Sequence, residues 1–307
     1  MALLARARRI WSLLWPVDAE YRLFDARAEH LGPYYVTFEE SGLRRTFDSE
    51  GVLRTDDVAY RDEILQYGLG QHALWRRLGD ERALDRFLAQ ARWASKEQRN
   101  TGGVRGSYGC DAGDLSATAQ GLAISLLLRA YEETQEILYL ERAVDASIPL
   151  AVDVRDGGVL WRSGTDVFFE AVGGPTPSHF LSGWIFGLWG LLELSRTAKI
   201  PAVDLLYEQS LATLEKYLPC YDTGSWSYES LLAAPCGFRR FASLPTHMLH
   251  VAQLSVMVSM TKNELFAIVG ERWRRYAVSF ESHAHVLANA VVLSDALTVP
   301  TGARSVV

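Results

Sequence analysis

The sequence has little cysteine and no stripe of basic residues. Its three cysteines, Cys110, Cys220 and Cys236, lie far apart without a CxxC pair. This pattern excludes a disulfide framework and a cysteine-rich zinc site and is typical of a reducing compartment, so we expect a cytoplasmic protein. Lys and Arg number 31 against 37 Asp and Glu, giving a formal charge of −6. With the basic residues dispersed, nucleic acid is not an expected partner.

Residues 1–16, MALLARARRIWSLLWP, are basic and apolar but stop at Pro16. A membrane-spanning helix needs about 20 apolar residues, so this segment is too short to span a bilayer. It also lacks the small-residue cleavage region of a signal peptide. We expect a helix docked on the body of the protein, with peripheral contact to a membrane surface as the alternative.

Aromatic residues, in contrast, are plentiful. The chain of 307 residues contains 9 Trp, 13 Tyr and 12 Phe and is 49% hydrophobic. That composition excludes a disordered protein and provides for one large domain or two modest ones. Aromatics are dense in YDTGSWSYESLL (residues 221–232), which predicts either packing of a long connection or the floor of a sugar-binding cleft.

From residue 60 onward, apolar residues recur at helical spacing, and the segments come in pairs. Four glycine-punctuated, mostly apolar segments are LQYGLGQHALWRRL, SATAQGLAISLLLRAY, SHFLSGWIFGLWGLLELS and THMLHVAQLSVMVSM. Each precedes a more charged, one-faced segment, as expected for a buried helix covered by an amphipathic partner. The pattern predicts a mainly α fold, an (α/α) toroid or barrel of paired helices, complete or partial; a flat helical stack is the alternative.

Short β elements interrupt the helical pattern. Alternating aromatic and β-branched residues in YYVTFEES and GVLRT predict a hairpin, and GGVLWRS and TDVFFEAV predict two more strands. We therefore expect an N-terminal helix and hairpin over residues 1–58 and an (α/α) barrel over residues 59–307.

Polar residues stand at the starts of the apolar helices, where a toroid would bring them to one end of its cavity. They are Gln66, Tyr67, Gln120, Ser182, His247 and Gln253. Convergent polar groups in an apolar cleft predict a small-molecule site. The alternative is that each satisfies a neighbouring backbone group.

The ordered segments QYGLGQHALW, GDLSATAQGLAISLLLRAY, FFEAVGGPTPSHFLSGWIFGLWGLLEL, YDTGSWSY and HMLHVAQL resemble the C-terminal domain of D-glucuronyl C5-epimerases. The resemblance runs from about Tyr60 to about Leu254. It implies an (α/α) barrel, usually dimeric, that removes the C5 proton of glucuronic acid in a heparosan-like polysaccharide and returns one from the opposite face. No cofactor is implied.

The resemblance also matches individual residues. Tyr228 matches a cleft tyrosine and is our first candidate proton carrier, with His247, Tyr67 and Glu170 as candidates for the other face. Further substrate-binding candidates from the matches and from side-chain chemistry are Arg239, Arg240, Arg105, Tyr60, Gln120, Trp226, His250 and Ser182. The arginines would neutralise the carboxylate, although surface solvation of arginine and core packing of tryptophan are the common alternatives. His247 and His250 lack a clear third ligand, so no metal site is predicted.

The sequence departs from the family pattern at sites of proposed proton carriers. Thr246 stands in place of a tyrosine, AVGG (Ala171 to Gly174) lacks another, and Ser182 replaces an asparagine. Three alternatives therefore stay open. One is a polysaccharide lyase using the same carbanion, the second is a non-catalytic saccharide-binding protein, and the third is a cavity recruited for an apolar small molecule.

Overall fold

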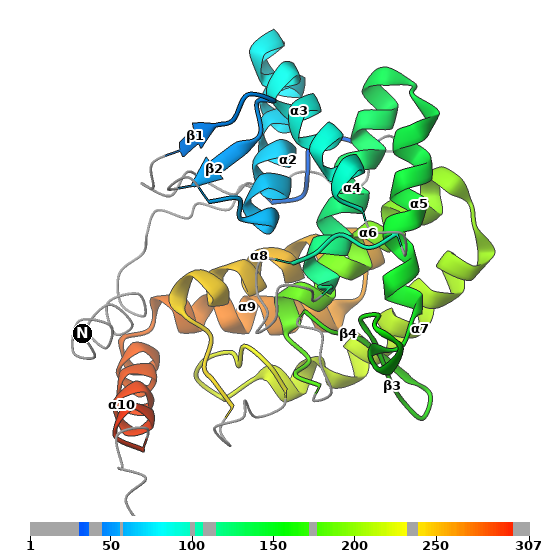
Figure 1. Ribbon diagram of the computed structural model, residues 1–307. Helices are drawn as coiled ribbons and strands as arrows, with labels where there is room; N and C mark the ends of the chain where they lie inside the picture. Colours follow the sequence, from blue (N-terminus) through cyan, green and yellow to red (C-terminus); the bar gives the residue numbers. More distant parts are fainter. Residues whose placement is uncertain are drawn as a thin grey trace, which may run out of the picture.

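The computed structural model describes residues 31–36, 45–55, 58–98, 102–106, 115–171, 177–231 and 239–296, with side chains up to 288 (Figure 1). α-Helices dominate this part of the chain. They are α2 (Arg61–Leu78), α3 (Glu81–Glu97), α4 (Ala117–Thr134), α5 (Ile137–Ala151), α6 (Leu181–Ala198), α7 (Pro201–Tyr217), α8 (Leu244–Thr261), α9 (Glu264–Val278) and α10 (Phe280–Ala296). Two antiparallel hairpins accompany them, β1 (Arg45–Phe47) with β2 (Leu53–Thr55) and β3 (Leu160–Ser163) with β4 (Asp166–Phe169).

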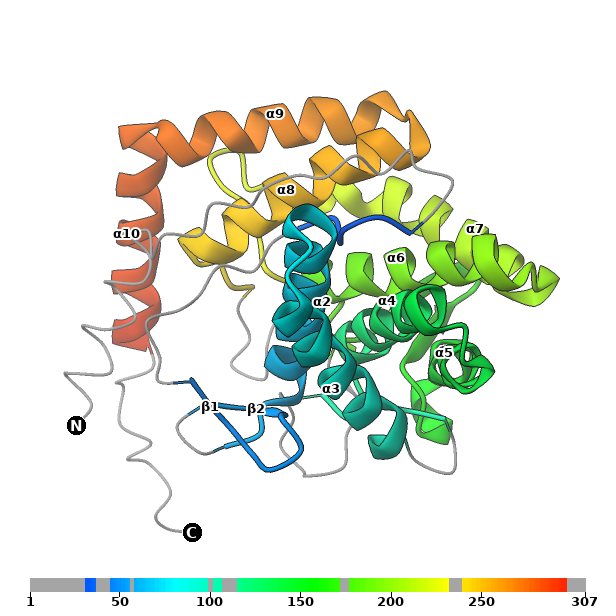
Figure 2. The same ribbon diagram turned by 90° about the horizontal axis from the view of Figure 1, so that it is seen from above.

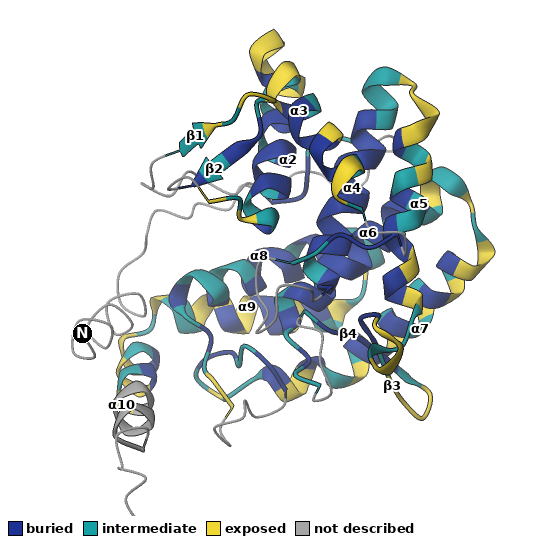
Figure 3. Cartoon of the chain, in the orientation of Figure 1, coloured by how far each residue is buried: buried dark blue, intermediate teal, exposed yellow. Residues whose placement is uncertain are grey.

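The helices form the predicted pairs. α2 packs on α3, α4 on α5, α6 on α7 and α8 on α9, while α2, α4, α6 and α8 are neighbours in that order. α4 and α6 are buried nearly all round, whereas their partners keep exposed outer faces (Figure 3). Viewed from above, the pairs follow one another around a curve (Figure 2). In the described part of the chain, α8 does not pack against α2 in the way that α4 packs against α6, so the inner helices do not close into a full ring. The mainly α, paired-helix fold is confirmed, in the form of a partial (α/α) toroid.

Glycine permits the closest approach of α4 and α6. A Cβ on Gly121 would lie 2.0 Å from the carbonyl oxygen of Phe186, and one on Gly190 would lie 2.8 Å from the Cα of Gly121. Since both nearest atoms are backbone, no rotamer change relieves the overlap, and only a shift of the helices makes room.

We expect Gly121→Ala to lower the free energy of unfolding by about 1–3 kcal/mol through overpacking. Gly70, within α2, is the matched control because a Cβ there meets nothing within 4 Å. Gly70→Ala should raise the free energy of unfolding by about 0.5–1 kcal/mol, as for a helix interior. Urea unfolding measures both, and equal effects of the two substitutions would contradict this account of the α4–α6 contact.

The β elements agree in part with the sequence prediction. β3 and β4 lie at the predicted GGVLWRS and TDVFFEAV segments. The N-terminal hairpin pairs Arg45–Phe47 with Leu53–Thr55, so GVLRT contributes a strand, whereas the described Tyr34–Val36 part of YYVTFEES forms none. Residues 37–44 and the expected helix of residues 1–16 lie outside the described residues. None of the described helices combines the length and apolar character needed to cross a bilayer.

A buried ion pair joins α4 to α6. Arg129 Nη2 donates to Glu193 Oε1 at 2.7 Å and Nη1 to Oε2 at 3.0 Å, and the two side chains are 1% and 0% exposed. Arg129 also donates to the carbonyls of Ser125 and Gly32. Its guanidinium lies 5.3 Å from the ring centroid of Tyr34. Residues 31–36 thus cover the Arg129–Glu193 ion pair, and the guanidinium nitrogens of Arg129 find their acceptors within the protein.

Candidate active site

The aromatic loop Tyr221–Leu231 lies between the segments that lead into α6 and α8 (Figure 1). On one side Phe180 and Ser230 form an antiparallel bridge, and Leu181 N donates to the Glu229 carbonyl at 3.1 Å. On the other side Tyr228 bridges Phe241 in the same sense. Backbone pairing therefore joins the aromatic loop to the segment before α6, about fifty residues earlier in the sequence, and to the segment before α8.

The loop turns at Gly224, whose φ of +86° favours glycine. The Asp222 carboxylate accepts from the Gly224 N–H at 2.8 Å, and the Thr223 hydroxyl oxygen accepts from the Trp226 N–H at 2.7 Å. The turn directs Trp226 inward, where its ring is fully buried and its Nε1 donates to the Ala242 carbonyl at 2.8 Å. The structure thus uses Trp226 for packing, with no exposed face to present to a sugar.

His247 and His250 of α8 share the hydroxyl of Ser227, a residue that the sequence analysis did not single out. His247 Nε2 lies 2.9 Å from the Trp273 carbonyl, which only accepts, so this nitrogen carries the proton. His247 Nδ1 then accepts from Ser227 Oγ at 2.8 Å, and Ser227 Oγ in turn accepts from His250 Nδ1 at 3.1 Å. Both histidines are fully buried, and both nitrogens of His247 are engaged. This geometry favours a structural role for His247 over proton transfer to a substrate.

Burial also keeps both imidazoles neutral. Desolvation lowers the pKa of His247 to about 4, against an opposing hydrogen bond to the Trp273 carbonyl. It lowers the pKa of His250 to about 3, and the neighbouring His247 adds to the effect. Histidine in an unfolded chain has a pKa of about 6.5. The unfolded state therefore binds more protons as the pH falls from about 6.5 towards 4, and the free energy of unfolding falls with it.

We expect His250→Gln to flatten this pH dependence by one proton, or about 1.4 kcal/mol per pH unit between pH 6 and 4.5. Urea unfolding of both proteins at a series of pH values measures the slopes. Buried groups that do not contact His250 titrate equally in the two proteins, so the difference between the slopes reports on His250 and its neighbour His247. Parallel curves would contradict the assignment.

Tyr228 and Arg239, two of the predicted site residues, lie together. The Arg239 guanidinium is 5.3 Å from the ring centroid of Tyr228, and the Phe241 ring meets that of Tyr228 edge-on at 5.4 Å. Tyr228 is half-buried, while Arg239 and Arg240 are exposed. Among the sequence candidates, this pair combines a phenol with an accessible cation that suits a carboxylate ligand.

Glu170 contacts a residue that the sequence analysis also missed. Its Oε2 accepts from the N–H groups of Ser178 and His179 at 2.8 and 3.0 Å and from the Ser178 hydroxyl, and its Oε1 accepts from His179 Nδ1. Burial raises the pKa of Glu170, but these donors and the His179 charge outweigh it and lower the pKa. With both oxygens engaged, Glu170 is placed to hold the segment before α6. The sequence signal for His179 is weak. In the structure its φ of +55° is uncommon for a residue other than glycine.

The other candidates lie on several elements. Gln120 is fully buried and bonded to both backbone groups of Val104, so it fastens the loop that carries the half-buried Arg105. Tyr67 packs against Phe47 and under the guanidinium of Arg45 in the N-terminal hairpin. Tyr60 is 42% exposed just before α2. The carbonyl of Ser182, which is half-buried, accepts from Gln253 at 3.0 Å.

Two of the residues at which the sequence departs from the family pattern, Thr246 and Ala171, lie in α8 and beside α6, respectively. Thr246 is half-buried in the first turn of α8, where its hydroxyl lies 2.8 Å from that of the capping Ser243. Ala171 contacts α6, because a Cβ on Gly183 would lie 2.4 Å from the Ala171 Cβ. Val172, Gly173 and Gly174 lie outside the described residues. Within the described residues, no three His, Cys, Asp or Glu side chains gather as metal ligands would.

Comparison with known proteins relates the chain to enzymes of uronic acids. The family model for the D-glucuronyl C5-epimerase C-terminus matches residues 90–275, more than half of the chain. A D-glucuronyl C5-epimerase of Caenorhabditis elegans is 29% identical over 264 residues, which are 77% of this chain and 42% of the relative. An uncharacterized protein of Methanocaldococcus jannaschii is 27% identical over 172 residues, 54% of either chain. The chain thus spans about half the length of the curated relatives that it matches.

Solved structures with some likeness are unsaturated glucuronyl hydrolases. That of a Bacillus species has a TM-score of 0.45 and 18% identity, over 74% of this chain and 62% of that chain. That of Streptococcus agalactiae has a TM-score of 0.45 and 17% identity, over 77% of this chain and 55% of that chain.

Proposed function

Because the chain belongs to the D-glucuronyl C5-epimerase family, we propose that it is an isomerase that inverts C5 of glucuronic acid units in a heparosan-like polysaccharide. The observation that carries this proposal is the Tyr228–Arg239 pair, with the guanidinium 5.3 Å from the phenol ring in the loop that most resembles the family. An acidic saccharide and, as the resemblance implies, a second copy of the chain would be its partners.

The chemistry requires three groups around C5. One group takes the proton while the C–H electron pair moves into the C6 carboxylate, and another returns a proton to the opposite face. A cation must also accompany the carboxylate, because the intermediate carries a second negative charge. Tyr228 supplies one proton carrier, and Arg239 supplies the cation. Of the candidates for the other face, Tyr67 offers a second phenol, on α2. His247 and Glu170 have their polar atoms engaged within the protein.

A polysaccharide lyase is the second candidate. It is supported by the hydrogen bonds that already occupy the polar atoms of His247 and Glu170, because these two residues are then less suited to act as a second proton carrier. A single phenol can remove H5 and then protonate the C4 leaving oxygen, so elimination needs fewer proton carriers than inversion. Elimination leaves a 4,5-double bond in the product, which absorbs ultraviolet light, whereas inversion leaves a saturated uronate.

The test is to incubate the protein with unsulfated heparosan oligosaccharides in heavy water and to follow the uronate C5 position by NMR. We expect deuterium at C5, with iduronate signals and no alkene signal. An alkene signal without iduronate would establish the lyase instead. Saccharide binding with neither deuterium nor alkene would rule out both reactions and leave a binding protein. Sedimentation analysis tests the expected homodimer separately.

A further inference from the structure

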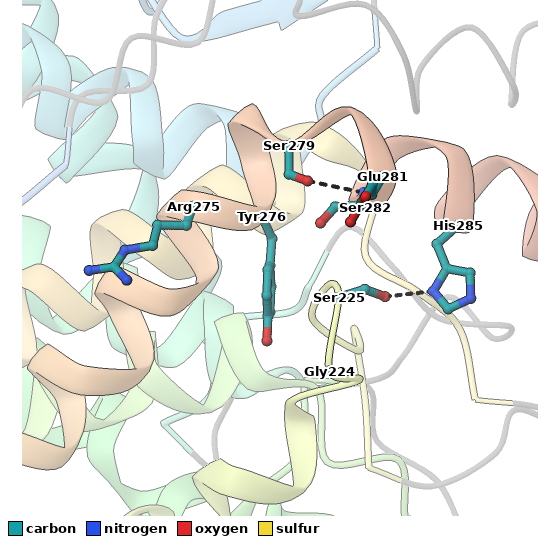
Figure 4. Close-up of a pocket in the computed structure, with 8 residues that line it drawn as sticks. All are labelled: Gly224, Ser225, Arg275, Tyr276, Ser279, Glu281, Ser282 and His285. Carbon is teal, nitrogen blue, oxygen red and sulfur yellow. Dashed lines mark hydrogen bonds between the residues drawn. The ribbon is translucent and has the colours of Figure 1, made fainter.

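A cavity of about 490 Å³ lies between the aromatic loop and the corner where α9 meets α10. Gly224 and Ser225 border it on the loop side, and Tyr276, Ser282 and His285 border it on the helix side. In Figure 4 the Tyr276 ring stands edge-on, with Arg275 on one side and the Ser225–His285 pair on the other. The volume lies within the range of small-molecule sites, about 300–1,000 Å³.

The walls of the cavity are held in place by hydrogen bonds. The Tyr276 hydroxyl donates to Asp222 Oδ1 at 3.3 Å, which fixes the orientation of its ring. Ser225 Oγ and His285 Nδ1 lie 2.9 Å apart and join the loop to α10. Glu281 and His285 are four residues apart and share one face of α10. The cavity therefore combines a fixed aromatic face with hydroxyl, imidazole and carboxylate groups opposite it.

The charges around the cavity indicate which sugar fits. Arg275 is the lining arginine, and its Nε lies 3.3 Å from Oε1 of Glu271, a carboxylate that it shares with Arg274. Glu281, also in the lining, would repel a carboxylate but accepts hydrogen bonds from sugar hydroxyls. An aromatic face suits the apolar C–H face of a pyranose. This balance favours a neutral sugar over a uronate.

We propose that the cavity is a saccharide subsite that takes a neutral pyranose unit on the side of the Tyr228-bound uronate where a uronate–hexosamine disaccharide has no further sugar. The inference rests on the proposed function, because it places the cavity on the path of the same polymer. Ser225 and Tyr228 are three residues apart, at most about 10 Å along an extended chain. An oligosaccharide with its uronate at Tyr228 is long enough to reach Tyr276, whereas a disaccharide occupies Tyr228 without filling the cavity.

The test compares binding of heparosan di-, tetra- and hexasaccharides by calorimetry. Tyr276→Ala is expected to weaken hexasaccharide binding about tenfold, as for one lost aromatic contact, and to leave disaccharide binding unchanged. Tyr276→Phe is the matched control, because it also loses the bond to Asp222 but keeps the ring, and it should bind like the unaltered protein. Glu281→Ala, at an exposed residue that cannot disturb the core, should also weaken only the longer ligands.

The subsite would be overturned if Tyr276→Ala weakened binding of all three saccharide lengths equally. It would also be overturned if either Tyr276→Ala or Glu281→Ala left hexasaccharide binding unchanged, or if Tyr276→Phe weakened binding as much as Tyr276→Ala. Absence of all saccharide binding would overturn it as well. The proposed reaction is judged separately, by deuterium at C5 in the unaltered protein. A length-dependent effect without deuterium would support the subsite and reject the epimerase, whereas deuterium without the length effect would do the reverse.

Discussion

Tyr228→Phe is expected to reduce deuterium incorporation at C5 by at least about a hundredfold, the usual contribution of a positioned acid or base. The substitution removes one oxygen and keeps the ring, so the edge-on contact with Phe241 and the contact with Arg239 persist. Saccharide affinity should therefore change little while the exchange rate falls. Calorimetry and NMR in heavy water separate these two quantities.

Tyr207→Phe is the matched control, since Tyr207 lies on α7, in the outer layer of helices. It should exchange deuterium at the rate of the unaltered protein. Full activity of Tyr228→Phe would remove Tyr228 from the mechanism and direct attention to Tyr67. Arg239→Ala, in contrast, should weaken binding of the acidic substrate, because it removes the exposed cation beside Tyr228.

Glu193→Gln is expected to lower the free energy of unfolding by about 3–5 kcal/mol, because it leaves the Arg129 charge buried without its counter-ion. The two side chains are 1% and 0% exposed, so water does not screen the unpaired guanidinium. Urea unfolding monitored by tryptophan fluorescence measures the effect. It also reports on residues 31–36, whose contacts with Arg129 depend on the same charge pair.

Two further variants test the cause of this effect. Glu271→Gln breaks the surface pair with Arg274, in which both side chains are about half exposed, and should leave the unfolding midpoint unchanged within error. Replacing Arg129 by Met and Glu193 by Leu together removes both charges and should recover most of the loss. A double variant as unstable as Glu193→Gln would mean that packing, and not the unpaired charge, decides the stability at this position.

The helix pairs could be predicted from the sequence because their signal is local. The mostly apolar run from Leu181 to Leu192 is typical of a helix that is buried all round. The pattern of Pro201–Tyr217, with apolar residues on one face of a helix of 3.6 residues per turn, is typical of a helix that covers such a core. The β3–β4 hairpin was equally readable, because Gly164 separates two short β-type runs. The resemblance of YDTGSWSY likewise identified the loop that carries Tyr228.

Hydrogen-bond partners were decided only by the tertiary structure. His247 and Trp226 look like site residues in the sequence, but packing of α8 against the loop stacks them at 3.8 Å inside the core. Ser227 carries no signal of its own, yet it joins two histidines. Glu170 has an acid's chemistry, but its role depends on which donors the segment before α6 brings to it. Residue type and spacing determined the fold, whereas contacts between distant segments determined which polar atoms are engaged and which remain for a ligand.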